Sequence, residues 1–178
     1  YKWIIRPRGN GLLVYDSGNS LANSDDDRYA LVGSQRGRGG LATPDVFAVA
    51  EDHDGQIWLG TGRGLALFYT PEVVFSGDDY DAEQILIEQD GNVQVLLETE
   101  VVSAIVVDGA NRKWVGTQTG GVYLVSPDGQ EQIHHFTAEN SPLPSNTILN
   151  LSLDGSTGEV YFGTDRGIMS YRSDATEG

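Results

Sequence analysis

Three segments of the chain repeat a single pattern, and this repetition limits the possible folds more than any other feature of the sequence. Each segment reads as an apolar run, a turn led by Asp, an aromatic residue, Gly-Thr, a short turn and a second apolar run. The segments are residues 45–71, 101–129 and 147–175. Such a repeat predicts one supersecondary unit per copy, stacked against its neighbours to bury a continuous core.

An aromatic residue anchors each copy, and the spacing of these anchors indicates the size of the unit. The anchors are Trp58, Trp114 and Tyr161, with Trp3 in a truncated copy that opens the chain. Successive anchors are 55, 56 and 47 residues apart, and a four-stranded propeller blade has about 40 to 50 residues. We therefore expect units of approximately residues 1–44, 45–100, 101–146 and 147–178.

Within each unit the apolar runs predict antiparallel strands, because β-rich runs separated by Gly and Asp turns are typical of hairpins. The expected strands are 3–5 and 11–15, then 47–50, 57–60 and 65–69, then 104–107, 113–116, 122–125 and 132–136, and finally 149–153, 160–163 and 168–171. Asp90-Gly91 lies between two further β-rich runs in residues 84–97, which predicts an additional hairpin. No segment has a helical period, so helix content should be near zero.

Several of these strands are apolar on both faces, as in residues 101–107. An antiparallel hairpin with one solvated face should alternate instead, and each sheet of a β-sandwich keeps such a face. Burial of both faces indicates sheets stacked face to face, so we expect an all-β partial β-propeller of about three to four antiparallel four-stranded blades. Because the chain opens inside an expected strand at Tyr1, we interpret it as a fragment of a longer protein.

The residues shared by the copies are interpreted as structural. The Gly of each Gly-Thr lies on a strand face, where a neighbouring blade can approach closely, and the tryptophans fill the space between blades. Sugar stacking is the alternative role for the tryptophans, but a ligand site would not need the same residue in every unit. The structural set is Trp3, Trp58, Gly60, Thr61, Trp114, Gly116, Thr117, Tyr161, Gly163 and Thr164.

Composition limits the partners of the chain. Its formal net charge of −15 repels phosphate backbones, so nucleic acid is not an expected partner. The chain contains no cysteine, which excludes disulfides and thiolate metal sites. No apolar run reaches the roughly 18 residues of a membrane-spanning helix, so no direct membrane span is expected.

A search for catalytic residues finds no convergent set, and we predict neither an enzyme nor a cofactor-binding protein. His53, His134 and His135 have no partners at metal-ligand spacing, so we predict no metal site. Asp52, Asp54 and the acidic run 25–27 offer oxygen atoms of the kind that calcium prefers, but acidic turns are ordinary in a chain of this charge. No Ser lies in a nucleophile elbow.

The Gly-rich segment 33–40 carries the one candidate ligand contact that we single out. It lacks the Gly-Lys-Ser/Thr ending of a phosphate loop, and no helix is expected after it. Arg36 and Arg38 could still contact an anion such as a sugar phosphate. A plain loop between blades is the alternative interpretation.

The repeat also resembles a known group of proteins. The motif Trp-x-Gly-Thr with the linker Asn-Ser-Pro-Leu-Pro-Ser-Asn at 140–146 is similar to the propeller repeats in periplasmic sensor regions of hybrid two-component regulators. Residues 100–178, including the stretch VDGANRKWVGTQTGGVYLV, are closer still to the last propeller blades of the PorZ-type family of the type IX secretion system. The first 44 residues match more loosely.

This resemblance implies a non-enzymatic binding or scaffold module of an outer-surface cargo-attachment complex. Members of the family are exported to the bacterial surface, join a complex with the cargo-attaching sortase, and are implicated in handling anionic lipopolysaccharide. The resemblance thus implies protein partners and an anionic glycan for this chain. The alternative is a periplasmic ligand-sensing propeller of a hybrid two-component histidine kinase. Open blade edges also predict self-association.

Overall fold

The computed structural model describes residues 1–89 and 91–176, and strands dominate it. One short 3-10 helix, η1 (Pro71–Phe75), is the exception within those ranges. The strands are β1 (Lys2–Ile5), β2 (Leu12–Asp16), β3 (Arg28–Val32), β4 (Arg38–Gly39), β5 (Val46–Glu51), β6 (Ile57–Thr61), β7 (Gly64–Phe68), β8 (Tyr80–Asp81), β9 (Leu86–Gln89), β10 (Asn92–Val95), β11 (Val102–Val107), β12 (Lys113–Thr117), β13 (Val122–Val125), β14 (Gln132–Phe136), β15 (Ile148–Asp154), β16 (Glu159–Thr164) and β17 (Gly167–Arg172).

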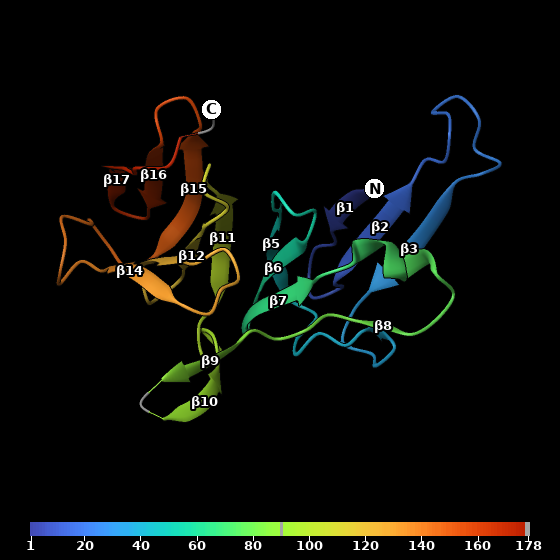
Figure 1. Ribbon diagram of the computed structural model, residues 1–178, viewed down its shortest axis with the longest axis horizontal. Helices are drawn as coiled ribbons and strands as arrows, with labels where there is room; N and C mark the ends of the chain where they lie inside the picture. The colour runs from blue at the N-terminus through green and yellow to red at the C-terminus, as the bar shows by residue number, and fades with distance from the viewer. Residues whose placement is uncertain (90, 177–178) are drawn as a thin grey trace.

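Four antiparallel sheets of three or four strands follow one another along the long axis of the molecule (Figure 1). The first sheet is β1-β2-β3, the second β5-β6-β7, the third β11-β12-β13-β14 and the fourth β15-β16-β17, counted over the residues that the structure describes. Each sheet is a meander, because strands joined by short turns pair with their sequence neighbours. The expected all-β partial propeller is confirmed.

The sheets differ in how their outer strands are completed. The third sheet has a fourth strand, β14, at its outer edge. In the second sheet an isolated bridge between Leu67 and Glu83 stands at that position, with two backbone hydrogen bonds of 2.8 Å. In the first sheet β3 is the outer strand, and the sequence pattern did not predict it. The segment 70–82 instead packs against the first sheet, where η1 contacts β3 and the side chains of Val74 and Tyr80 join the core.

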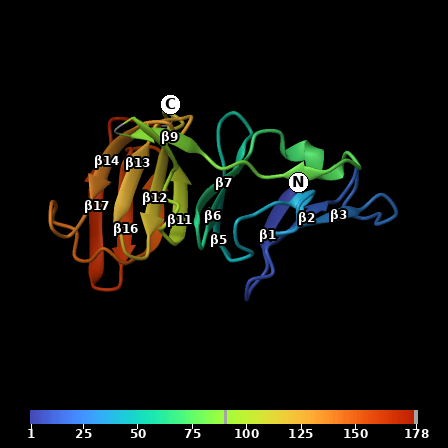
Figure 2. The same ribbon diagram turned by 90° about the horizontal axis from the view of Figure 1, so that it is seen from below.

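Neighbouring sheets pack face to face through apolar side chains, as the two-sided patterns indicated. The core between the first and second sheets contains Leu12, Val14, Leu59 and Phe68. A second core lies between the second and third sheets, and a third between the third and fourth. Figure 2 shows β11 beside β5 and β6, which places the inner strands of the two sheets against each other. Face-to-face burial, rather than pairing along edges, thus joins one sheet to the next.

The expected hairpin in residues 84–97 is present as β9 and β10, paired antiparallel from Leu86↔Val95 to Gln89↔Asn92. Asp90, on which the turn prediction rested, lies outside the described residues. The hairpin projects from the row of sheets (Figure 1), and the side chains of Leu86 and Val93 are exposed.

None of the helices within the described part of the chain is long and apolar enough to cross a membrane.

Candidate functional site

The Asp that leads each turn in the second and third units is a buried acceptor. Asp52 and Asp108 are 5% and 0% exposed. One carboxylate oxygen of each accepts the indole N–H of the anchor tryptophan six residues later, at 2.9 Å from Trp58 and 3.2 Å from Trp114. The other oxygen accepts two backbone N–H groups of its own turn. The recurring spacing of Asp and Trp is therefore a hydrogen bond that fixes the hairpin and the indole together.

A buried lysine of the third sheet neutralises Asp52 of the second. The Nζ atom of Lys113 lies 2.9 Å from Asp52 Oδ2, and both side chains are at most 1% exposed. Nζ also donates to the carbonyls of Asn111 and Pro127 and lies 4.5 Å from the centre of the Trp58 ring. Burial alone would raise the pKa of Asp52, but the hydrogen bonds from Lys113 and Trp58 hold that pKa below its ordinary value.

Asp108 is neutralised differently, by an arginine of its own turn. Arg112 Nε donates to Asp108 Oδ2 at 2.8 Å. The same guanidinium donates to Ser173 and Asp174, which follow the last strand of the fourth sheet. Sequence reasoning identified neither Lys113 nor Arg112, because basic residues beside turns are ordinarily exposed.

The glycines of the Gly-Thr pairs lie where sheets approach most closely. A Cβ atom on Gly60 would lie 2.7 Å from a methyl group of Val102 in the next sheet, and one on Gly116 would lie 2.6 Å from Ile148. On Gly163 it would meet nothing nearer than 3.5 Å, because no described sheet packs on that face. The following threonines have a local role, since each hydroxyl donates to a glycine carbonyl across its own hairpin; these are Thr61, Thr117 and Thr164.

The aromatic anchors differ in burial. Trp58 and Trp114 are 0% exposed and belong to the cores on either side of the third sheet. Trp3 is partly buried against Phe68 of the second sheet, with ring centres 5.3 Å apart. Tyr161 was expected to pack between blades but is 39% exposed. It lies on the same open face of the fourth sheet as Gly163, which explains the difference.

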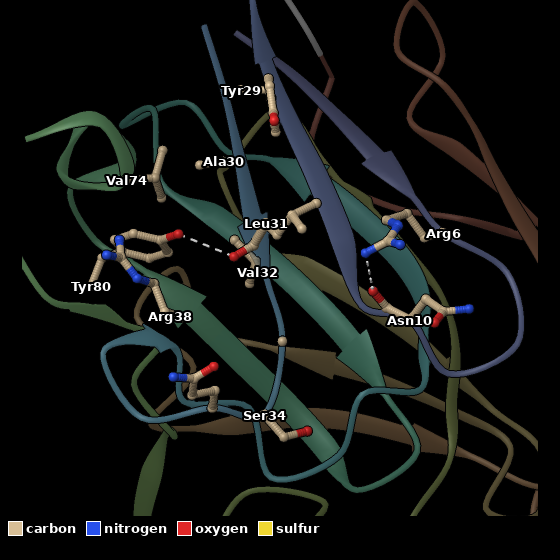
Figure 3. A pocket seen from close by; sticks show the side chains of 12 residues that line it. Arg6, Asn10, Tyr29, Ala30, Leu31, Val32, Ser34, Arg38, Val74 and Tyr80 are labelled. Atoms are coloured by element: carbon tan, nitrogen blue, oxygen red, sulfur yellow. Dashed lines mark hydrogen bonds between the residues drawn. The ribbon is translucent and has the colours of Figure 1, made fainter. Parts of the chain in front are cut away.

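A pocket of about 480 Å³ lies beside β3 and contains one of the two arginines singled out from the sequence. Arg38 lines this pocket and lies over the ring of Tyr80, 5.4 Å from its centre. Figure 3 shows both side chains on one side of β3, where the hydroxyl of Tyr80 donates to the carbonyl of Leu31 at 3.1 Å. Arg36 is exposed and does not line the pocket.

Arg6 lines the pocket from the other side of β3 (Figure 3), and its guanidinium donates to the carbonyl of Asn10. Within the described ranges neither Arg6 nor Arg38 forms an ion pair. In a chain with a net charge of −15, two guanidinium groups without carboxylate partners place a local positive charge at one pocket.

The Gly-rich segment 33–40 is held by short pairing with the chain after η1. β4 pairs with β8 in parallel, and the backbone N–H of Gly37 donates to Asp81 Oδ1 at 2.7 Å. An acidic side chain therefore occupies the loop at Gly37.

The histidines and acidic residues do not assemble into a further site. His135 stacks on Tyr123, with ring centres 3.9 Å apart, and its Nε2 lies 2.6 Å from the carbonyl oxygen of Gly120. Over residues 1–89 and 91–176, no group of three or more His, Asp or Glu side chains is arranged to hold a metal ion.

Comparison with known proteins adds to this geometry. Residues 40–63 match the family described as two component regulator propeller. PorZ, an essential bacterial surface component of the type IX secretion system of Porphyromonas gingivalis, is 31% identical and superposes on 99% of the chain with a TM-score of 0.85. The extracellular domain of the putative hybrid two component system BT3049 of B. thetaiotaomicron is 24% identical over 75% of the chain, with a TM-score of 0.56. No curated protein matches.

The chain spans 24% of the length of the PorZ structure and 16% of the BT3049 structure. The likeness to BT3049 shows a shared propeller fold. The likeness to PorZ extends over every sheet described above and comes with closer sequence identity. The stacked sheets, the repeat that matches the regulator-propeller family and this superposition together show that the chain is a partial β-propeller similar in sequence and fold to PorZ.

Proposed function

We propose that the chain is a non-enzymatic binding and scaffold module of an outer-surface type IX secretion complex that attaches cargo. The observation that carries the proposal is the superposition on PorZ over 99% of the chain at 31% identity. An exported protein at the bacterial surface, with the secretion and sortase proteins as partners, is the context that this likeness supports.

The sheet stack suits such a role physically. Its apolar cores lie between sheets, so that loops and outer strand edges remain available for partners. The projecting β9–β10 hairpin and the basic pocket beside β3 are two such features. Binding proteins commonly present recognition residues on loops held by a rigid scaffold.

Co-isolation from the cells that make the protein tests the scaffold role. An epitope-tagged form of the protein that carries these residues would be cross-linked at the cell surface, purified and analysed by mass spectrometry. We expect secretion-system proteins and the sortase to be enriched over a tagged surface protein of similar abundance. Recovery of the protein without any of them would contradict the proposal.

An anionic glycan is the alternative ligand that we propose for the basic pocket beside β3, because Arg6 and Arg38 concentrate positive charge there. Titration with anionic lipopolysaccharide should give saturable binding, whereas neutral lipopolysaccharide from the same strain should bind more weakly. Equal binding of both would contradict the glycan role and leave the scaffold role intact.

A sensor propeller is the alternative function. It is favoured by the match of residues 40–63 to the two component regulator propeller family and by the fold shared with the BT3049 extracellular domain. The sequence that the gene encodes after residue 178 discriminates between the two functions. A membrane helix followed by a kinase domain downstream of residue 178 would favour the sensor, and a β-sandwich with a sorting signal would favour the secretion module.

A further inference from the structure

The outer edge of β3 carries backbone groups that point away from its own sheet. The carbonyl of Leu31 accepts the Tyr80 hydroxyl from outside the sheet. Two residues further on, the backbone of Gly33 bonds outward as well, donating to the carbonyl of Arg38 and accepting from the N–H of Leu41. Alternate residues of an antiparallel strand direct both backbone groups to the same edge. Tyr29 and Leu31 therefore form the outer edge of β3, and Gly33 continues that edge beyond the strand.

Part of this edge has no bonding partner. In the described part of the chain, nothing accepts the backbone N–H of Tyr29 or Leu31, and nothing donates to the carbonyl of Tyr29. The 480 Å³ pocket runs along the same residues, and the side chain of Tyr29 is 73% exposed. Unpaired groups on an exposed edge are a template for an additional strand.

The two arginines are placed on either side of this template. Figure 3 shows Arg38 and Tyr80 on one side of β3 and Arg6 on the other. Successive side chains of an added strand would point alternately to these two sides. One acidic residue could then reach Arg38 while its neighbour in the sequence reaches Arg6.

We propose that the edge of β3 binds an extended acidic peptide segment of a partner protein by strand addition. Backbone hydrogen bonds to Tyr29 and Leu31 would hold the peptide, and two adjacent acidic side chains would pair with Arg38 and Arg6. This inference rests on the proposed binding and scaffold function and names the partner of one site within it. A peptide fits this edge better than a glycan does, because a peptide presents donors and acceptors at the spacing of a strand.

The pocket along β3 sets the length of the peptide. The backbone groups free to pair with it are the N–H and carbonyl of Tyr29 and the N–H of Leu31, because the carbonyl of Leu31 and the backbone of Gly33 are already bonded. The pocket continues along residues 29–33, and five residues of an antiparallel strand extend about 17 Å. A peptide of about eight residues covers this distance with its ends free. The probe is a fluorescein-labelled octapeptide, Gly-Thr-Val-Asp-Glu-Val-Thr-Gly, and its neutral control replaces Asp-Glu with Asn-Gln.

Fluorescence anisotropy with the purified chain measures binding. We expect saturable binding of the acidic peptide and weaker binding of the neutral control. Substitution Arg38→Glu or Arg6→Glu should weaken binding about tenfold through charge reversal beside the peptide. Arg36→Glu makes the same charge change on an exposed residue of the same loop outside the pocket, and it should change affinity less than about twofold. Equal effects of Arg36→Glu and Arg38→Glu would overturn the proposal.

Two N-methylated forms of the peptide test strand addition without altering the protein. One form is methylated at alternate backbone nitrogens, and the other at the intervening ones. Only one set of N–H groups faces β3 in an added strand, so one form should lose binding and the other should retain it. Equal affinity of the two forms would overturn strand addition.

A charge-matched oligogalacturonate separates peptide recognition from general attraction of anions. Binding at least tenfold weaker than that of the peptide is expected, and equal binding would overturn the peptide proposal. The co-isolation experiment gives an independent result, because partners recovered by an Arg38→Glu protein would support the scaffold function even if this site binds no peptide.

Discussion

At the scale of single residues, the interface between the second and third sheets depends on a charge that has no access to water. Lys113 brings a positive charge between the sheets, and Asp52 balances it at 2.9 Å. The Trp58 ring and two carbonyls complete the surroundings of Nζ. Because every polar group of the pair is bonded, removal of one partner leaves a buried charge that nothing compensates.

The substitution Lys113→Met tests this dependence. It preserves much of the side-chain volume but leaves the Asp52 carboxylate without its cation. We expect the free energy of unfolding to fall by about 3–5 kcal/mol, measured by urea denaturation. The matched control is Lys2→Met at an exposed lysine, which should change it by less than about 0.5 kcal/mol. Equal effects of the two substitutions would show that the buried pair is not stabilising.

The pH dependence of stability follows from the same pair. The folded protein holds the pKa of Asp52 below its ordinary value of 3.8, so the carboxylate contributes stability above that value. The contribution is lost as pH falls through the lower pKa of the folded state. The unfolding free energy should therefore decline more steeply below pH 4 in the natural protein than in Asp52→Asn. Parallel curves in urea denaturation at each pH would contradict this expectation.

At the scale of elements, the closeness of neighbouring sheets depends on glycines in their second strands. The side chain of Val102 packs on Gly60, and that of Ile148 packs on Gly116; each comes from the first strand of the next sheet. The equivalent Gly163 has open space beyond it. One repeated residue therefore has different structural consequences according to what packs upon it.

Alanine substitutions at these glycines should separate the two situations. Gly116→Ala places a methyl group 2.6 Å from Ile148, and such overpacking should cost about 1–3 kcal/mol. Gly163→Ala is the matched control, and it should be neutral or stabilise by up to about 1 kcal/mol, since Ala suits a strand better than Gly. Thermal unfolding of both variants measures the difference. A larger loss from Gly163→Ala would contradict the assigned close approach.

Apart from β3, β4 and β8, the strands and their stacking could be predicted from the sequence, because both follow from local patterns. Two-sided apolar runs require burial on both faces wherever they occur. The burial of Lys113 could not be predicted in this way, because it depends on a carboxylate 61 residues earlier in the chain. Of the two arginines that line the basic pocket, sequence analysis singled out only Arg38. Arg6 and Tyr80 were not predicted there, since they reach the pocket from distant segments. Contacts between segments far apart have no short-range signal.

At the scale of the whole molecule, the row of sheets exposes apolar residues at both ends. Ile4 and Leu31 of the first sheet are 45% and 46% exposed, and Ile168 of the fourth is 76% exposed. The outer edge of β17 has no described strand beside it. Such surfaces and edges favour pairing with another chain.

We expect the chain to self-associate through these ends. Light scattering should give a mass that rises with protein concentration, and Ile168→Lys should shift the chain toward monomer, because charge on an edge strand opposes pairing. Arg36→Lys, which preserves the charge of an exposed loop residue, should leave the mass unchanged. A monomeric mass at every concentration would contradict this expectation.

The pairing of Lys113 with Asp52 also restricts how a gene for such a repeat can evolve. Unequal recombination could duplicate residues 45–100 in tandem. Ile57 precedes its anchor tryptophan as Lys113 precedes Trp114. In the new copy, Ile57 would therefore face Asp52 of the preceding copy, where Lys113 now lies. That carboxylate would be buried without a cation. The blades are therefore not interchangeable. A duplicated blade must acquire a basic residue that neutralises this buried carboxylate before the duplication can be retained.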